Sequence, residues 1–139
     1  MNIELLKKVR DAIADEDNPV GFDMDRWGKL NDPCGTTCCV AGHAVMIGGR
    51  NRWKWTASYV GVVMAARKQY DEWWLGDIGS GLDDEDGIGH LAAELLDLSA
   101  DDAAYLFGGG WSSLRLEYIT RADAASYLDR CIKAGEIIR

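Results

Sequence analysis

The stretch CGTTCCVAGHAV, from Cys34 to Val45, holds three of the four cysteines and one of the two histidines of the chain. It continues as CCVAGHAVMI over residues 38–47, and this run is apolar on nearly every side. A helix that is apolar all round belongs in the interior of a protein. We therefore predict that residues 38–47 form a buried central helix, which the glycines at 48 and 49 end.

Five other segments carry helical signals. They are the N-terminal stretch with Leu5, Leu6, Val9 and Ile13 at helical spacing, residues 57–74, residues 88–96, the segment from Ser99 to the glycines at 108–110, and the segment from Thr120 to Gly135. Asp102 follows Ser99, and Asp123 follows Thr120, at the spacing of a capping box, which is typical of helix starts. Together the segments predict a mainly α fold, a compact bundle of about six helices.

The middle of the chain departs from this pattern. NRWKWT, from Asn51 to Thr56, alternates polar or basic residues with tryptophan and suggests a short extended segment. Residues 75–89 contain five glycines and predict an irregular loop. The length of 139 residues is typical of one domain. We predict a single α-helical domain over residues 1–139, in which residues 50–87 are an inserted tryptophan-rich helix followed by an acidic, glycine-rich loop.

The charge balance restricts the class of protein. Acidic residues outnumber basic ones by 23 to 15, and the formal net charge is -8. Nucleic-acid phosphates repel such a chain, so direct nucleic-acid binding is not expected. No apolar run approaches the roughly 18 residues of a membrane span, and the N-terminal stretch lacks the pattern of a signal peptide. We expect a cytoplasmic protein that does not bind membranes and whose cysteines stay reduced.

The cysteine and histidine residues allow a zinc site as an alternative. Cys39 and His43 stand four residues apart, and Cys34 could add a third ligand. The fourth would have to be His90 or Cys131. The chain has no CxxC pair, however, and free cysteine usually behaves as a small buried apolar residue. The leading expectation is core packing, with no metal and no cofactor.

A cysteine nucleophile is the other alternative. Cys38 and Cys39 would lie in the first helical turn, where backbone N–H groups favour a thiolate, and His90 could serve as the base. The apolar neighbours argue for burial, which raises the pKa of a thiol. A lone histidine such as His43 on an apolar helix is more often a core residue that bonds to the backbone. We therefore predict no catalytic residue.

The tryptophans suggest a binding surface. Six are present, too many for a modest core to hide completely, and partial exposure of several would mark a binding face. The alternative is that all six pack in the core and at its rim. The predicted partner-binding residues are four tryptophans and the acidic run after them: Trp53, Trp55, Trp73, Trp74, Asp83, Asp84, Glu85 and Asp86.

Several of these stretches resemble one group of proteins. FDMDRWG (residues 22–28), CGTTCCVAGHAV, the helix pair from Leu91 to Phe107, and TRADAASYLDRCIKAG (residues 120–135) are similar to small, uncharacterised phage and bacterial proteins with the motif CGTxxCxAGxA. Cys34 and Cys39 match the motif, and Cys38 is an extra cysteine. The resemblance implies a compact helical fold and a phage origin, and it transfers no catalytic residue.

These observations favour a non-enzymatic accessory protein of the host cytoplasm that binds and modulates a host protein. The alternative is a zinc-stabilised or cysteine-dependent enzyme built on Cys34, Cys38, Cys39 and His43. A weaker alternative is an acidic inhibitor that imitates DNA.

Overall fold

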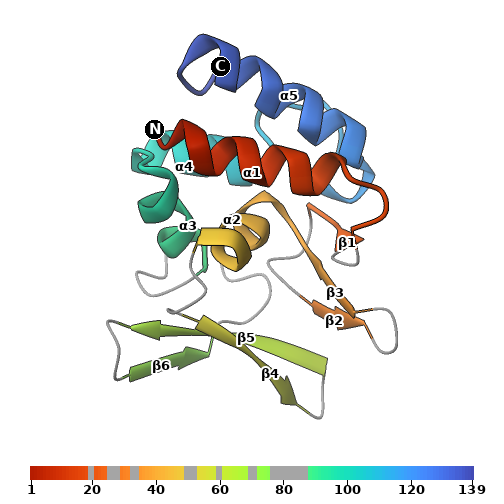
Figure 1. Ribbon diagram of the computed structural model, residues 1–139, viewed down its shortest axis with the longest axis vertical. Helices are drawn as coiled ribbons and strands as arrows, with labels where there is room; N and C mark the ends of the chain where they lie inside the picture. Colours follow the sequence, from red (N-terminus) through yellow and green to blue (C-terminus); the bar gives the residue numbers. More distant parts are fainter. Residues whose placement is uncertain are drawn as a thin grey trace.

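The computed structural model describes residues 1–18, 21–24, 29–31, 35–48, 53–58, 61–68, 72–75 and 88–139. These residues contain helices α1 (Ile3–Ala14), α2 (Val40–Gly48), α3 (Ile88–Leu96), α4 (Ala100–Phe107) and α5 (Arg121–Ala134), with a 3-10 turn, η1 (Leu116–Tyr118). They also contain strands β1 (Gly21–Phe22), β2 (Lys29–Asn31), β3 (Gly35–Cys38), β4 (Trp53–Ser58), β5 (Gly61–Lys68) and β6 (Glu72–Leu75). The described regular structure is mainly helical, as predicted (Figure 1).

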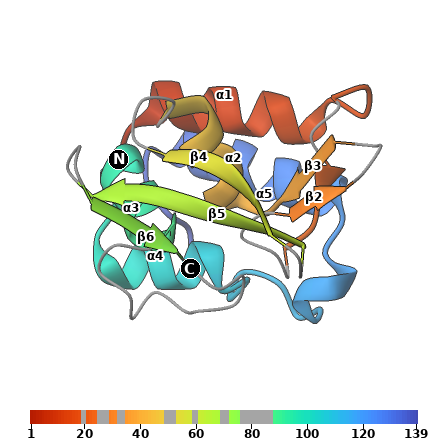
Figure 2. The same ribbon diagram turned by 90° about the horizontal axis from the view of Figure 1, so that it is seen from below.

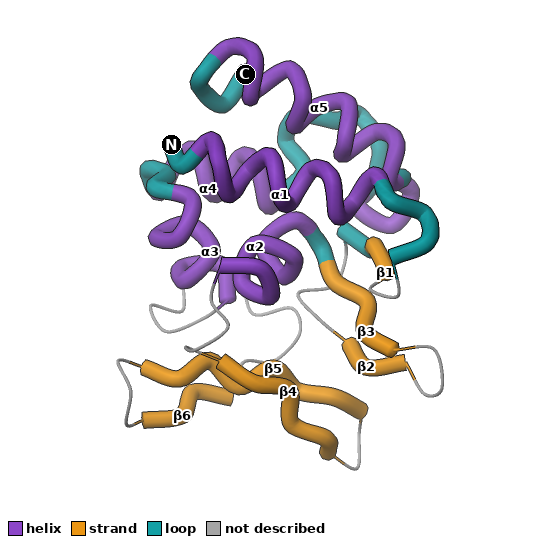
Figure 3. The backbone as a smooth tube through the Cα atoms, viewed as in Figure 1, coloured by secondary structure: helices purple, strands orange, loops and turns teal. Residues whose placement is uncertain are grey.

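The helices and strands separate in space. The helices gather on one side of the molecule and the sheet β4–β5–β6 on the other (Figure 3). Seen from below, this sheet lies across the helical layer (Figure 2). Its strands are antiparallel, with β5 in the centre. A second small sheet has the order β1-β3-β2, and β3 leads into α2.

Helix α1 lies between α5 and α2, and α2 also packs against α3 (Figure 1). The four residues predicted to form its apolar stripe, Leu5, Leu6, Val9 and Ile13, are all buried. The buried apolar residues of the other helices are Val40, Ala41, Ala44 and Val45 on α2, Leu91, Ala92 and Leu96 on α3, Ala103, Leu106 and Phe107 on α4, and Ala124, Tyr127, Leu128 and Cys131 on α5. Among the residues whose burial the structure describes, the core therefore lies mainly within the helical layer.

The predicted helix starts at Ser99 and Thr120 are confirmed. The Thr120 hydroxyl accepts a hydrogen bond from the N–H of Asp123, and the Asp123 carboxylate accepts one from the N–H of Thr120, which completes a capping box. The Ser99 hydroxyl likewise accepts from the N–H of Asp102. Here, however, the Asp102 carboxylate accepts from the Ser99 hydroxyl instead of the backbone.

The helix predicted over residues 57–74 is wrong. Ala57 and Ser58 end β4, and β5 and β6 follow, so the described residues contain five α-helices instead of six. The segment includes Val62 and Val63, whose branched side chains favour strands, and a short apolar run fits either period. The extended segment expected at residues 51–56 is confirmed by β4 for its described part.

The start of the buried helix also differs from the prediction over residues 38–47. Cys38 is the last residue of β3, Cys39 follows it, and α2 begins only at Val40. Residues 76–87, which make up most of the predicted glycine-rich loop, lie outside the described residues.

Candidate functional site

Cys39 and His43 form a local unit at the start of α2. Cys39 is 3% exposed and His43 is 1% exposed. The Cys39 carbonyl accepts two hydrogen bonds from His43, one from the backbone N–H at 2.9 Å and one from the ring Nδ1 at 2.9 Å. A carbonyl can only accept, so Nδ1 of His43 carries a hydrogen. The prediction of a core histidine that bonds to the backbone is thus confirmed.

The environment of the Cys39 thiol is set by two opposing effects. Burial raises its pKa to about 11, while the backbone N–H groups of Gly42 and Ala41 act in the opposite direction. These N–H groups belong to the first turn of α2, where the helix dipole favours a thiolate. Burial is the larger effect, so Cys39 is a thiol at neutral pH and a poor nucleophile.

The ligands of the alternative zinc site are not brought together in the described residues. Cys34 lies outside them, and Cys38 lies at the end of β3. His90 is on α3, and Cys131 is buried on α5. The part of the chain that the structure describes contains no group of three or more His, Cys, Asp or Glu residues that could hold a metal ion. Cys39 and the first six residues of α2, Val40 to Val45, are buried and belong to the core.

The register of β4, β5 and β6 places the tryptophans relative to one another. Trp53 pairs with Ala66, and Ala66 also pairs with Trp74, so one row across the sheet reads Trp53–Ala66–Trp74. Trp55 pairs with Met64 in a second row. Directly paired residues, and residues two apart on one strand, share a face of an antiparallel sheet. We call this face, defined by Trp53, Trp55, Trp74, Ala66 and Met64, the tryptophan face.

The fourth tryptophan of the predicted surface belongs to the other side of the sheet. Trp73 pairs with Arg67, one position out of phase with Trp74. Lys54, between Trp53 and Trp55, shares that opposite face because its partner is Ala65. The strand register thus places three of the four predicted tryptophans on one face of the sheet and Trp73 on the other. The acidic residues Asp83, Asp84, Glu85 and Asp86 lie outside the described residues.

Trp111, by contrast, is partly buried and packs against the core of the helical layer. Its indole N–H donates to the carbonyl of Leu106 at 2.9 Å. Its ring stacks on Tyr127, with ring centroids 4.6 Å apart and planes 7° apart. The guanidinium of Arg130 lies over the Tyr127 ring at 5.5 Å. This side chain therefore joins the segment after α4 to α5.

The structure shows two exposed apolar residues that sequence reasoning did not select. Leu114 is 48% exposed and Tyr118 is 62% exposed, both between α4 and α5. Their exposure could have been predicted from their sequence context, because both lie among polar residues in SSLRLEY, outside every apolar helical stripe. Singly exposed apolar residues are common on protein surfaces and define no site by themselves.

Comparison with known proteins yields no match, whether to a family model, to a curated protein or to a solved structure. Among the described residues, no helix has both the length and the apolar character that crossing a membrane requires.

Proposed function

We propose that this protein acts by binding another protein through the tryptophan face of β4–β5–β6, as a non-catalytic accessory protein. Following the resemblance to small phage and bacterial proteins, we place it in the cytoplasm of a phage host. The observation that carries the proposal is the register row Trp53–Ala66–Trp74, with Trp55 two residues from Trp53. Three tryptophans from two strands share one face of a small sheet.

The size of these residues supports a binding role. A tryptophan contributes about 150–250 Å² of buried surface when a partner covers it. Three of them would supply up to about 750 Å², close to the roughly 800 Å² that one protein contributes to an interface of standard size. Tryptophan is also enriched among the residues whose truncation weakens binding most.

The charge of the chain indicates the chemistry of the partner. The formal net charge is -8, and the acidic run Asp83–Asp86 follows β6 in the sequence. An acidic surface attracts a basic partner and so accelerates their association. This attraction weakens as the salt concentration rises, because ions screen the charges. We propose a partner with a basic patch beside an apolar one.

Capture from a lysate of the native host tests the proposal. The variants are Trp74→Ala, on the tryptophan face, and Trp73→Ala, its neighbour on the opposite face and therefore a matched control. We expect Trp74→Ala to lose a protein that the wild type and Trp73→Ala both retain. The proposal fails if all three retain the same background proteins.

A folding control accompanies the capture. If the tryptophan face were instead buried against the helices, Trp74→Ala would remove a core side chain, at a cost of about 3–5 kcal/mol. We expect the free energy of unfolding of Trp74→Ala, measured in urea, to lie within about 1 kcal/mol of the wild type. A loss of the size expected for a core residue would contradict the proposal.

A further inference from the structure

The chain turns back after α5 (Figure 3). Gly135 ends this helix with φ of 78°, and a Cβ at this position would meet no atom within 4 Å. Glycine adopts such a left-handed conformation without strain, so the turn does not depend on contacts with its surroundings. We call the residues that follow, 136–139, the return segment.

The two isoleucines of the return segment contact the helical layer. Ile137 is 8% exposed and belongs to the apolar core, and Ile138 is partly buried against it. The Tyr127 hydroxyl of α5 also donates to the main-chain carbonyl of Ile138 at 2.8 Å. The helices therefore bind two aliphatic side chains and one main-chain group of this segment.

The arginine of the return segment contacts α4. The Arg139 guanidinium donates to the Asp102 carboxylate at 2.7 Å. It also lies over the Tyr105 ring, 5.5 Å from the ring centroid, in a cation–π arrangement. A carboxylate beside an aromatic ring is a suitable site for a guanidinium, because the two groups bind its edge and its face.

Contacts outside the return segment hold these side chains in place. One Asp102 oxygen accepts from the Ser99 hydroxyl at 2.8 Å, and the other oxygen faces the guanidinium. The Tyr105 ring lies against Gly110, where a Cβ would come within 2.7 Å of a ring carbon. Tyr127 is held by the stacking and cation–π contacts described above. A surface that is organised in advance loses less entropy when a ligand binds.

We infer that this surface, defined by Asp102, Tyr105 and Tyr127, binds a segment of another protein with the chemistry of the return segment: two aliphatic residues followed by arginine. The return segment occupies the surface until the partner displaces it. Exchange is feasible because only Ile137 is fully buried, whereas the Arg139 side chain is 53% exposed. The formal net charge of -8 favours the approach of a basic ligand. This surface is separate from the tryptophan face and adds a second binding site to the proposed function.

Titration of the full-length variant Arg139→Ala with the peptide GEIIR tests the inference. The substitution removes the chain's own contact with Asp102 at an exposed position. The peptide repeats residues 135–139 and is acetylated and amidated, so its ends carry no charge. We expect a saturable shift of the NMR signal of the Trp111 indole N–H, because this ring stacks on Tyr127. The wild type should bind the peptide about tenfold more weakly, because its own arginine competes for the surface.

Matched controls test the role of the arginine, all in the Arg139→Ala chain. The peptide GEIIA, which lacks the guanidinium, should bind about tenfold more weakly than GEIIR. Asp102→Asn should weaken GEIIR about fivefold and leave the binding of GEIIA unchanged, since only GEIIR contacts this carboxylate. Asp101→Asn removes the same charge from the same turn of α4 and should weaken GEIIR by less than about twofold.

Three results would overturn the inference. The first is no shift of the Trp111 signal with GEIIR at millimolar concentration, which would make the return segment an internal brace only. The second is equal binding of GEIIR and GEIIA, or equal losses from Asp102→Asn and Asp101→Asn. The third comes from analytical ultracentrifugation, in which we expect a monomer: a wild-type dimer that Arg139→Ala abolishes would show that the return segment of a second copy occupies the surface.

Discussion

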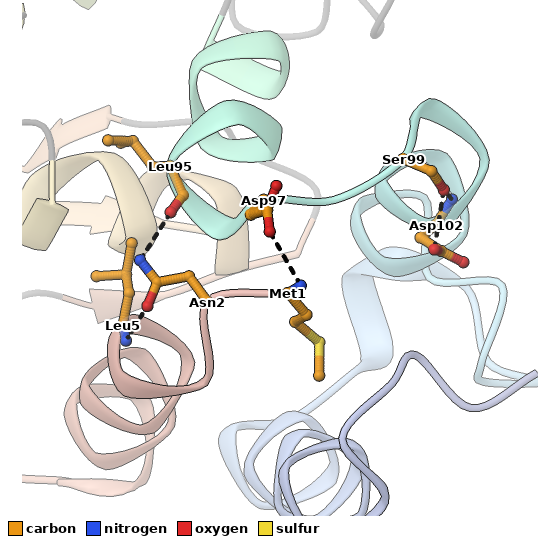
Figure 4. A network of polar contacts seen from close by, with 7 residues as sticks. All are labelled: Met1, Asn2, Leu5, Leu95, Asp97, Ser99 and Asp102. Carbon is orange, nitrogen blue, oxygen red and sulfur yellow. Dashed lines mark hydrogen bonds and ion pairs between the residues drawn. The ribbon is translucent and has the colours of Figure 1, made fainter.

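Asn2 joins the beginning of α1 to the end of α3, and its replacement gives a sharp test of the helical framework. Its side-chain Oδ1 accepts from the N–H of Leu5 at 3.1 Å, and its Nδ2 donates to the carbonyl of Leu95 at 3.1 Å. Its backbone N–H donates to the carbonyl of Leu96 at 2.7 Å. Figure 4 shows both side-chain contacts. A neutral amide suits this place, because the start of α1 is the positive end of a helix dipole and the end of α3 is a negative one.

The two side-chain contacts set the expected magnitudes. Asn2→Ala removes the helix cap, which costs about 1 kcal/mol, and the bond to Leu95, which costs about 1 kcal/mol or less at this exposed position. We expect a total loss of about 1.5–2 kcal/mol. Asn2→Asp keeps an acceptor for Leu5 but replaces the donor to Leu95 with a carboxylate oxygen. We expect it to lose about 1 kcal/mol.

Urea denaturation at pH 7, with the slopes of the transitions compared, measures these differences in the free energy of unfolding. The expected order of stability is wild type, Asn2→Asp, Asn2→Ala. Ser113→Ala, at an exposed position of the segment between α4 and α5, is the control and should lie within about 0.5 kcal/mol of the wild type. If Asn2→Asp is as stable as the wild type, the bond to Leu95 does not contribute and the reasoning is refuted.

Three other changes test the packing around the helices. Asp97 follows the last residue of α3 with φ of 52°, a region that favours glycine, and its exposed carboxylate pairs with the Met1 ammonium at 3.2 Å. Because an exposed ion pair contributes little, Asp97→Gly should raise the free energy of unfolding by up to about 1 kcal/mol in urea, and a loss of stability would contradict this. The Ser99 hydroxyl and the Arg139 guanidinium lower the pKa of Asp102. A carboxyl with a lowered pKa stabilises the fold above its unfolded pKa of about 3.9 and loses this effect as the pH falls through its folded pKa. Asp102→Asn should therefore be less stable than the wild type at pH 7. Thermal unfolding at a series of pH values should show this difference in stability disappear below about pH 4. A difference that does not change with pH would contradict the reasoning. The Tyr127 hydroxyl donates to the carbonyl of Ile138 at 2.8 Å, so Tyr127→Phe should cost about 1–2 kcal/mol in urea, and an unchanged stability would contradict this.

The parts of the fold that local sequence signals determine could be predicted. The apolar stripe of α1 and the caps at Ser99 and Thr120 depend on residues three or four apart. The helix pattern predicted over residues 57–74 failed because strands are stabilised by partners distant in the sequence, such as Ala66 for Trp53. The junction at Asn2 could not be predicted either, because its partner Leu95 is 93 residues away.

In the candidate site, too, local features could be predicted from the sequence and long-range pairing could not. The burial of Cys39 and His43 followed from their apolar neighbours, and the structure confirms it. The tryptophans were selected as a group by residue type, but only the strand register separates Trp73 from Trp74. Residue type therefore indicated which residues to consider, and long-range pairing determined which of them share a face.

We propose that the segment around Cys39, which is buried, is not a reactive centre, and the alkylation rate of this cysteine tests this claim most directly. Iodoacetamide is added at pH 8 to the native and to the urea-unfolded protein, and mass spectrometry follows Cys39 alone. Burial raises the pKa of this thiol from 9.0 to about 11, which leaves about a hundredfold less thiolate at pH 8. We predict that native Cys39 reacts at least about a hundredfold more slowly than unfolded Cys39. Equal rates in the two states, or a native rate that rises with a midpoint near pH 7, would contradict the claim.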